Sequence, residues 1–116
     1  MSFTANNVVQ ERHIVLVDFP FSDDRSSKLR PALVISSKAV HSTGDLMLMM
    51  ITSKEKHDGL NIAIAPEDLT KPLPLKSYLR CHKIFILRSD LVVRELSRLN
   101  KDCYAEAVNL LYAIVK

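Results

Sequence analysis

The sequence predicts a mainly β protein that ends in an α-helix. Most of the chain consists of short runs rich in β-branched and aromatic residues, separated by short polar loops. From Asn100 onward the apolar residues instead recur at helical spacing. Because strand-like runs do not alternate with helices, the pattern favours a small, strongly bent antiparallel barrel with the terminal helix packed on it.

The length of 116 residues suits one domain with one core, taken here as residues 1–116 with a loose polar arm at 1–11. No run approaches the roughly 20 apolar residues of a membrane-spanning helix. The N-terminus also lacks the basic start and apolar stretch of a secretory signal. We therefore expect a cytoplasmic protein with no membrane contact.

Three strands are expected in the first half of the chain. The run 13–21 has the composition of a buried strand, and the wholly polar loop 22–28 follows it. A second strand resumes at Pro31, since a missing N–H is tolerated at a strand's first residue. The third run, 46–53, is continuously apolar and fits a strand buried on both faces.

Two further strands, 60–65 and 77–87, bring the expected total to about five. Between them, Pro66 and the acidic residues after it suit one helical turn. The following "KPLPL" cannot be regular helix, because each proline removes a donor. Asn100 is a suitable N-cap for the terminal helix.

Two apolar stripes run along this helix. One is expected to pack on the barrel and contains Tyr104, Val108, Leu111 and Val115. The other is available to a twofold-related copy and contains Ala107, Leu110 and Ile114.

Charge and special residues limit the classes of function. Lys and Arg number 16 against 13 Asp and Glu, so a net charge of +3 is compatible with a polyanionic partner. A glycine-rich phosphate loop is excluded because the only glycines are Gly44 and Gly59. The histidines and cysteines are scattered without paired ligand spacing, so neither a metal nor another cofactor is expected, and Cys81 and Cys103 are expected to remain reduced.

Arg30 stands at the mouth of the second strand. The ring of Pro31 pushes the residue before it into an extended conformation, which partly fixes the direction of the arginine side chain. Such a cation could bind a phosphate. On residue type alone, an ion pair with Asp18, Asp23 or Asp24 at the barrel rim is the favoured interpretation.

Several stretches taken together resemble a known family. "IVLVDFPFSDDRSSKLRPALVIS", then "MMITSK", then "SYLRCHKIFIL" with a terminal amphipathic helix, are similar to the MazF/PemK (Kid-like) toxins of bacterial type II toxin–antitoxin modules. The likeness runs from His13 to the end of the chain. It implies an SH3-like barrel, a homodimer, and a sequence-selective, metal-independent endoribonuclease that cuts single-stranded RNA. It also implies a cognate antitoxin whose disordered tail covers the site.

The resemblance assigns roles to individual residues. Arg30 matches the family's catalytic arginine and Thr52 its catalytic threonine. Arg80-Cys81-His82 stands where the Kid-like branch has Arg-Cys-Asp. The sequence departs from the family at Arg12-His13, where Gly-Asp or Gly-Glu is usual. Its first loop lacks glycine, and the loop histidine of the Kid-like branch has no counterpart.

The residue types suit RNA cleavage by attack of the 2′-OH, which leaves a 2′,3′-cyclic phosphate and a 5′-OH. Arg30 can stabilise the charge that grows on the phosphoryl oxygens, and the Thr52 hydroxyl can donate to the phosphate. Arg80 and His82 have the same parity on one strand and therefore share a face. Histidine beside an arginine suits proton transfer. Side chains in or beside the framing loops are expected to contact the RNA: Arg25, Lys28, Ser53, Lys54, Lys56 and Lys83.

Two other functions remain open from the sequence. A CcdB-like toxin would inhibit DNA gyrase through its dimer surface without cutting anything, and it would not need an Arg-Pro and a Thr-Ser pair facing one groove. A barrel that binds nucleic acid or a peptide without catalysis is the third possibility, favoured by the missing loop glycines and by histidine at position 82.

Overall fold

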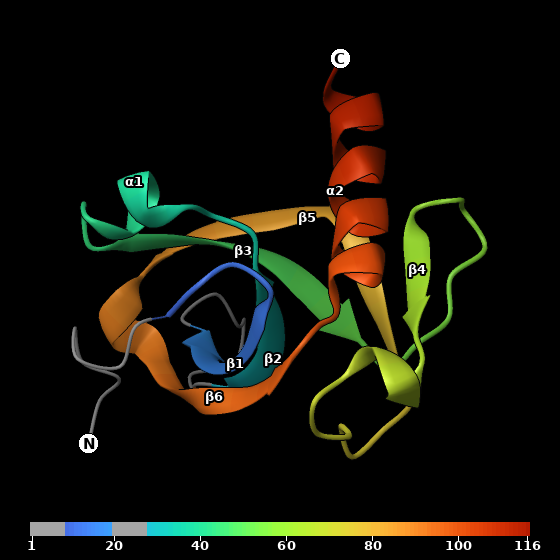
Figure 1. Cartoon of the computed structure of the whole chain (residues 1–116), viewed down its shortest axis with the longest axis horizontal. Helices are drawn as coiled ribbons and strands as arrows, with labels where there is room; N and C mark the ends of the chain where they lie inside the picture. The colour runs from blue at the N-terminus through green and yellow to red at the C-terminus, as the bar shows by residue number, and fades with distance from the viewer. Residues whose placement is uncertain (1–8, 20–27) are drawn as a thin grey trace.

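The computed structural model describes residues 9–19 and 28–116. In this part of the chain six strands form one antiparallel sheet in the order β4-β5-β3-β2-β1-β6 (Figure 1). The strands are β1 (His13–Phe19), β2 (Lys28–Val34), β3 (Asp45–Thr52), β4 (Asn61–Ile64), β5 (Ser77–Arg88) and β6 (Val92–Arg98). The helices are α1 (Lys38–His41) and α2 (Lys101–Val115), with short 3₁₀ turns at Pro66–Asp68 and Ser89–Leu91.

The predicted fold class is confirmed, and the five predicted strands correspond to β1 through β5. The predicted ends of the first strand, Pro20 and Phe21, lie outside the described residues. The expected number of strands was wrong, because β6 is a sixth. Its sequence "VVRELSR" holds three charged residues and is mostly exposed, as suits an edge strand whose ladder within the described residues is with β1.

The second strand begins at Lys28 rather than at Pro31, so Arg30 lies within β2. Residues 28–33 pair with β1, whereas pairing with β3 is confined to 32–34. Pro31 therefore lies in a stretch that is bonded on one side alone, where a missing donor is tolerated.

The sheet is strongly bent like a barrel, as predicted, but it is not closed. β4 and β6 are its two edges and do not pair with each other. The connection after β4 partly bridges them: Leu69 forms an isolated bridge with Leu99, and the Thr70 amide donates to the Arg98 carbonyl at 3.1 Å.

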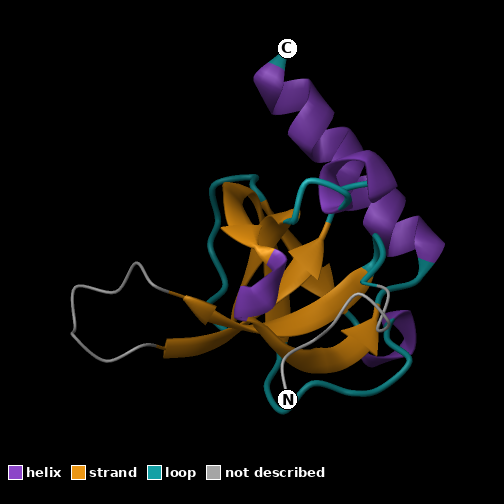
Figure 2. Cartoon of the chain, turned by 90° about the vertical axis from the view of Figure 1, so that its left-hand side faces the viewer, coloured by secondary structure: helices purple, strands orange, loops and turns teal. Residues whose placement is uncertain are grey.

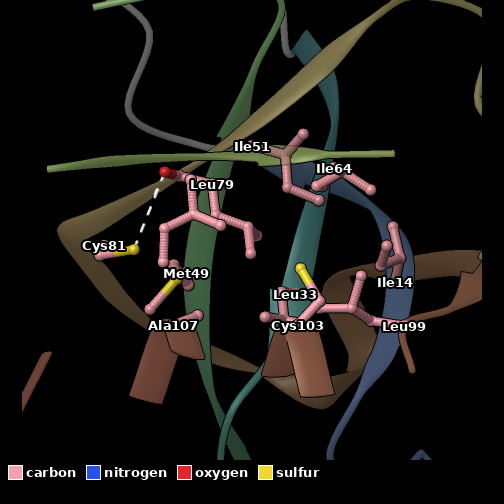
Figure 3. Packing of buried hydrophobic residues seen from close by; sticks show 11 residues of the cluster. Ile14, Leu33, Met49, Ile51, Ile64, Leu79, Cys81, Leu99, Cys103 and Ala107 are labelled. Carbon is pink, nitrogen blue, oxygen red and sulfur yellow. Dashed lines mark hydrogen bonds between the residues drawn. The ribbon is translucent and has the colours of Figure 1, made fainter. Parts of the chain in front are cut away.

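Apolar residues are buried on both faces of the central strands. On β1, Ile14 belongs to the cluster beneath α2, whereas Val15 and Val17 belong to a second cluster on the opposite face. The buried residues of β3 are shared between the two clusters in the same way, with Met49 in the first and Leu48 in the second. This two-sided burial confirms the prediction for the continuous apolar run, because α2 covers one face (Figure 3) and the bend of the sheet encloses the other.

Both cysteines are free and buried in the cluster under α2 (Figure 3). Burial raises the pKa of the Cys81 thiol to about 11 and that of Cys103 to about 12. The thiols therefore stay protonated near neutral pH and act as small apolar groups.

Helix α2 begins as predicted. The Asn100 side chain accepts a hydrogen bond from the Cys103 amide at 2.9 Å, and its Nδ2 donates to Asp68 Oδ1 at 3.0 Å. The helix packs against β5 and β4, and its last turns extend beyond the strands (Figure 2).

The predicted core stripe of α2 was wrong in part. Cys103 and Ala107 are the buried residues of the helix. Tyr104 and Leu111 pack beside them, but Val115 is 69% exposed because the last turn lies past the sheet. Ala107, which was assigned to a twofold copy, is fully buried in this core.

Most of the predicted arm, residues 1–11, lies outside the described residues. At its end, Val9 packs against the second apolar cluster and Glu11 accepts a hydrogen bond from the Tyr104 hydroxyl at 3.4 Å. Arg12 then adopts φ of 74°, a region that favours glycine. Glycine is the residue that the family resemblance predicts there.

His13 opens β1 with only 3% of its surface exposed. Arg98 Nη2 lies 2.8 Å from His13 Nε2, and His13 Nδ1 lies 3.4 Å from the Gln10 amide nitrogen and 3.6 Å from Glu95. Burial lowers the pKa of His13, and the cations Arg98 and Arg12, together with His41, lower it further, while Glu95 opposes them.

We expect the stability of the protein to fall as the pH drops below the ordinary histidine pKa of 6.5. The folded chain keeps His13 neutral whereas the unfolded chain takes up a proton, so acid favours unfolding. The urea midpoint should therefore be lower at about pH 5.5 than at about pH 7.5.

The matched variants are His13→Gln, whose amide oxygen can still accept from Arg98, and His57→Gln, which changes an exposed loop histidine. The difference in urea midpoint between the two pH values should shrink in His13→Gln and persist in His57→Gln. An undiminished difference in His13→Gln would show that other groups cause it.

Candidate active site

Arg30 and Thr52 are brought together by the register of β2 and β3. Ala32 pairs with Met50. Continuing this register by two residues places Arg30 opposite Thr52, just where the ladder stops and the strands separate. Directly opposed residues point to the same face of a sheet, so the guanidinium and the hydroxyl share one face.

These two residues line a cavity of about 360 Å³, called here the cationic cavity. Five of its lining side chains are cations and four are large apolar groups. The lining consists of Phe19, Lys28, Arg30, Met50, Ile51, Thr52, Lys56, Arg80, Lys83 and Phe85. Such a concentration of positive charge suits a phosphate-containing ligand.

A second cavity of about 540 Å³, called here the apolar cavity, adjoins the first. The two share Lys28, Arg30, Ile51 and Thr52. The rest of the apolar cavity comes from Leu29, Pro31, Ser53, Lys54, Leu73, Pro74, Leu75, Ser77 and Leu96. Arg30 and Thr52 therefore stand where a charged and an apolar surface meet.

The Thr52 hydroxyl has a defined orientation. The backbone N–H of Lys54 donates to Thr52 Oγ1 at 3.1 Å. Because the oxygen accepts in this bond, the hydroxyl proton is left to donate elsewhere.

Arg30 is exposed and forms no ion pair with another residue that the structure describes. The alternative pairing with Asp18 does not occur. Asp18 lies opposite Leu29, whereas Arg30 lies opposite Val17, so the two side chains point to different faces of the ladder. Asp23 and Asp24 lie outside the described residues.

Arg80, by contrast, is 7% exposed and fully engaged. Its two terminal nitrogens donate to the two carboxylate oxygens of Asp58, each at 3.0 Å, and Nη1 also donates to Asn61 Oδ1 at 2.6 Å. The hydrogen bond from Arg80 is the main cause that lowers the pKa of Asp58 to about 2, so this carboxylate is ionised near neutral pH.

His82 lies beside Arg80, as the shared parity predicted, with its Nε2 3.4 Å from Arg80 Nη2. It is exposed, but it is not among the residues that line either cavity. The pairing of β5 with β3 jumps from Arg80 opposite Met50 to Ile84 opposite Met49, so residues 81–83 form a bulge. Strands bend at such bulges, and this bend sets the directions of the Arg80 and His82 side chains.

The other predicted RNA-binding residues are divided between the two cavities. Lys28 lines both, Lys83 lines the cationic cavity, and Ser53 and Lys54 line the apolar one. Arg25 lies outside the described residues.

Several residues of this site were not predicted from the sequence. Phe19 and Phe85, whose rings meet edge to face at 5.5 Å, form the apolar wall of the cationic cavity. Asp58 and Asn61 hold Arg80. Only the pairing of Asn61 with Arg80 across β4 and β5 could have revealed this contact, because the residues are far apart in sequence.

In the part of the chain that the structure describes, no group of three or more His, Cys, Asp or Glu is placed to hold a metal ion. Over the same residues, no helix combines the length and apolar character needed to cross a membrane.

The family model of the PemK-like, MazF-like toxin of type II toxin–antitoxin systems matches residues 10–115, and the chain belongs to this family. None of the curated proteins matches it significantly.

Solved structures show the same fold at low sequence identity. A MazE–MazF crystal structure from Deinococcus radiodurans is 21% identical with a TM-score of 0.76, over 93% of this chain and 96% of that chain. An endoribonuclease from a mycobacterial species is 18% identical with a TM-score of 0.75, over 94% and 92%. The Mycobacterium tuberculosis toxin MazF-mt6 is 16% identical with a TM-score of 0.67, over 88% and 97%.

Proposed function

We propose that this toxin is a sequence-selective endoribonuclease that cuts single-stranded RNA without a metal ion. The observation that supports this most directly is the shared cavity: Arg30 and Thr52 lie on opposed strands among four further cations. Similar structures include an endoribonuclease and MazF proteins. The attack of a 2′-OH on the neighbouring phosphorus would leave a 2′,3′-cyclic phosphate and a 5′-OH.

Arg30 stabilises the charge that develops on the phosphoryl oxygens. Its planar fork can bind two of these oxygens at once, and it is exposed, so a phosphate can reach it. The guanidinium keeps its charge at any working pH, so Arg30 is not the base.

Thr52 donates its hydroxyl proton to the same phosphate. The Lys54 amide already occupies one lone pair of the oxygen, which fixes the hydroxyl on the strand. A hydroxyl held in this way stabilises the transition state without adding charge.

His82 is the candidate for proton exchange, since it is an exposed imidazole beside the cavity wall. Its Nε2 is engaged by Arg80, so it must give up that contact before it accepts a proton there.

The remaining cations bind the RNA backbone. Lys56 and Lys83 face the cationic cavity with Lys28, while Ser53 and Lys54 extend the surface toward the apolar cavity. Arg25 belongs to the same proposal on sequence grounds. Each phosphate contact on a single strand steepens the salt dependence of binding by roughly 0.7 in logarithmic slope.

The proposed protein partners are inferred from the family to which the chain belongs. Structures of similar proteins include MazE–MazF complexes, and we propose that a cognate antitoxin covers the Arg30–Thr52 region of this chain. We also propose a cytoplasmic homodimer. Sedimentation at monomer mass in micromolar solution would contradict the dimer.

The deciding experiment incubates the purified protein with mixed-sequence RNA in excess EDTA. We expect cleavage, with 2′,3′-cyclic phosphate and 5′-OH ends, and a common sequence at the cut sites when the ends are sequenced. RNA that stays intact would refute the proposal. Tight binding to DNA gyrase without cleavage would instead favour the CcdB-like alternative.

A further inference from the structure

We propose that Asn61, Asp58 and Arg80 are positioning residues that hold the Thr52 hydroxyl in place for RNA cleavage. This inference rests on the proposed endoribonuclease function. It reassigns Arg80, which the sequence placed among the catalytic residues, and it adds two residues that the sequence did not indicate.

Both terminal nitrogens of Arg80 are already engaged by groups of the protein. A guanidinium carries four hydrogens on its two terminal nitrogens. Nη1 donates to Asp58 Oδ1 at 3.0 Å and to Asn61 Oδ1 at 2.6 Å, while Nη2 donates to Asp58 Oδ2 at 3.0 Å and lies 3.4 Å from His82 Nε2. A substrate phosphate would have to displace a bidentate carboxylate, so Arg80 acts on neighbouring groups of the protein.

A continuous chain of hydrogen bonds joins Arg80 to Thr52. The Asn61 side chain accepts from Arg80 through Oδ1 and donates through Nδ2 to the Lys54 carbonyl at 3.4 Å. The Lys54 amide then donates to Thr52 Oγ1 at 3.1 Å. The Asn61 amide thus links a buried cation to the backbone that orients the catalytic hydroxyl.

Asp58 secures the other end of the same loop. Its Oδ1 accepts from the Leu60 amide at 3.0 Å as well as from Arg80, and the Leu60 carbonyl accepts from the Cys81 amide at 3.0 Å. The loop between β3 and β4 is therefore tied at both ends to β5. This matters for chemistry because the loop carries Lys56 into the cationic cavity and begins directly after Thr52.

Removal of the linking amide should affect turnover more than binding. We expect Asn61→Ala to lower kcat roughly tenfold while KM changes less than about twofold, because Thr52 acts in the transition state. The matched control is Asn109→Ala, an exposed asparagine on α2, which should leave both constants unchanged.

Asp58→Asn gives a second test, in which simple electrostatics and a positioning role predict different changes. On electrostatics alone, Asp58→Asn would tighten RNA binding, since it removes a negative charge beside a cationic cavity. A positioning role predicts lower kcat without tighter binding. Asp90→Asn, which alters an exposed aspartate paired with Arg88, is the control. Tighter RNA binding with unreduced kcat in Asp58→Asn would overturn the proposal.

A double-mutant cycle separates this inference from the proposed function. If Asn61 acts through Thr52, Asn61→Ala should have no further effect on kcat in a Thr52→Ala background. Equal losses in both backgrounds would overturn the positioning role while the nuclease function stands.

Hydrogen exchange of the Lys54 amide is a test that does not depend on RNA cleavage. Loss of protection in Asn61→Ala supports the link to Thr52 even if the wild-type protein cuts no RNA, in which case only the proposed function fails. Unchanged protection would overturn the link.

Discussion

Arg30→Ala is expected to abolish nearly all RNA cleavage, with a fall in kcat of roughly 10² to 10³. The substitution removes the exposed guanidinium opposite Thr52 and leaves the developing phosphoryl charge without its bidentate partner. Fold and stability should remain close to wild type, since the side chain is exposed. Initial rates on an RNA oligonucleotide that contains the cleavage sequence give the measurement.

Arg94→Ala is the matched control, because Arg94 is an exposed strand arginine on β6 that lines neither cavity. Its rate should equal that of the wild-type protein. Arg30→Lys retains the charge without the fork and should recover only part of the rate. Full activity in Arg30→Ala would remove the central residue of the proposal.

Leu79→Ala is expected to lower the free energy of unfolding by about 2 to 5 kcal/mol. Leu79 is fully buried and lies between Ile51 on β3 and Ile62 on β4. Truncation leaves a cavity under α2 that neighbouring strands cannot fill without distortion. The loss is a large part of the roughly 5 to 15 kcal/mol that holds a typical domain together.

Urea denaturation followed by circular dichroism measures this change as a lower midpoint with an unchanged slope. Leu75→Ala is the control, since that leucine is 66% exposed and its loss should change stability by less than about 0.5 kcal/mol. Equal midpoints for the two variants would show that the cluster under α2 contributes little.

The sequence sufficed for those parts of the fold that local chemistry determines. Composition predicted β1 to β5, and Asn100 predicted the start of α2. β6 was missed because an edge strand that contacts one neighbour need not be apolar. The predicted buried stripe of α2 was wrong in part, because helical periodicity does not show where the sheet beneath a helix ends.

The residues of the candidate site also form two groups, those that the sequence indicated and those that it did not. Arg30 and Thr52 could be named because the runs that contain them resemble motifs of the family, and their common cavity follows from the register of β2 with β3. The partners of Arg80 could not be named. Asp58 reaches Arg80 from a loop whose path depends on the β4–β5 pairing and on the bulge in β5, neither of which leaves a local signature.

The position of β1 also bears on how the chain is made. β1 is synthesised before the other five strands, yet one of its two neighbours in the sheet is β6, which is synthesised after them. Leu99, at the start of the final helix, completes the same cluster as Ile14. Such long-range pairing slows folding, and β1 cannot be fully flanked while the ribosome is still adding β6. The nascent toxin therefore cannot complete its sheet until β6 has been translated.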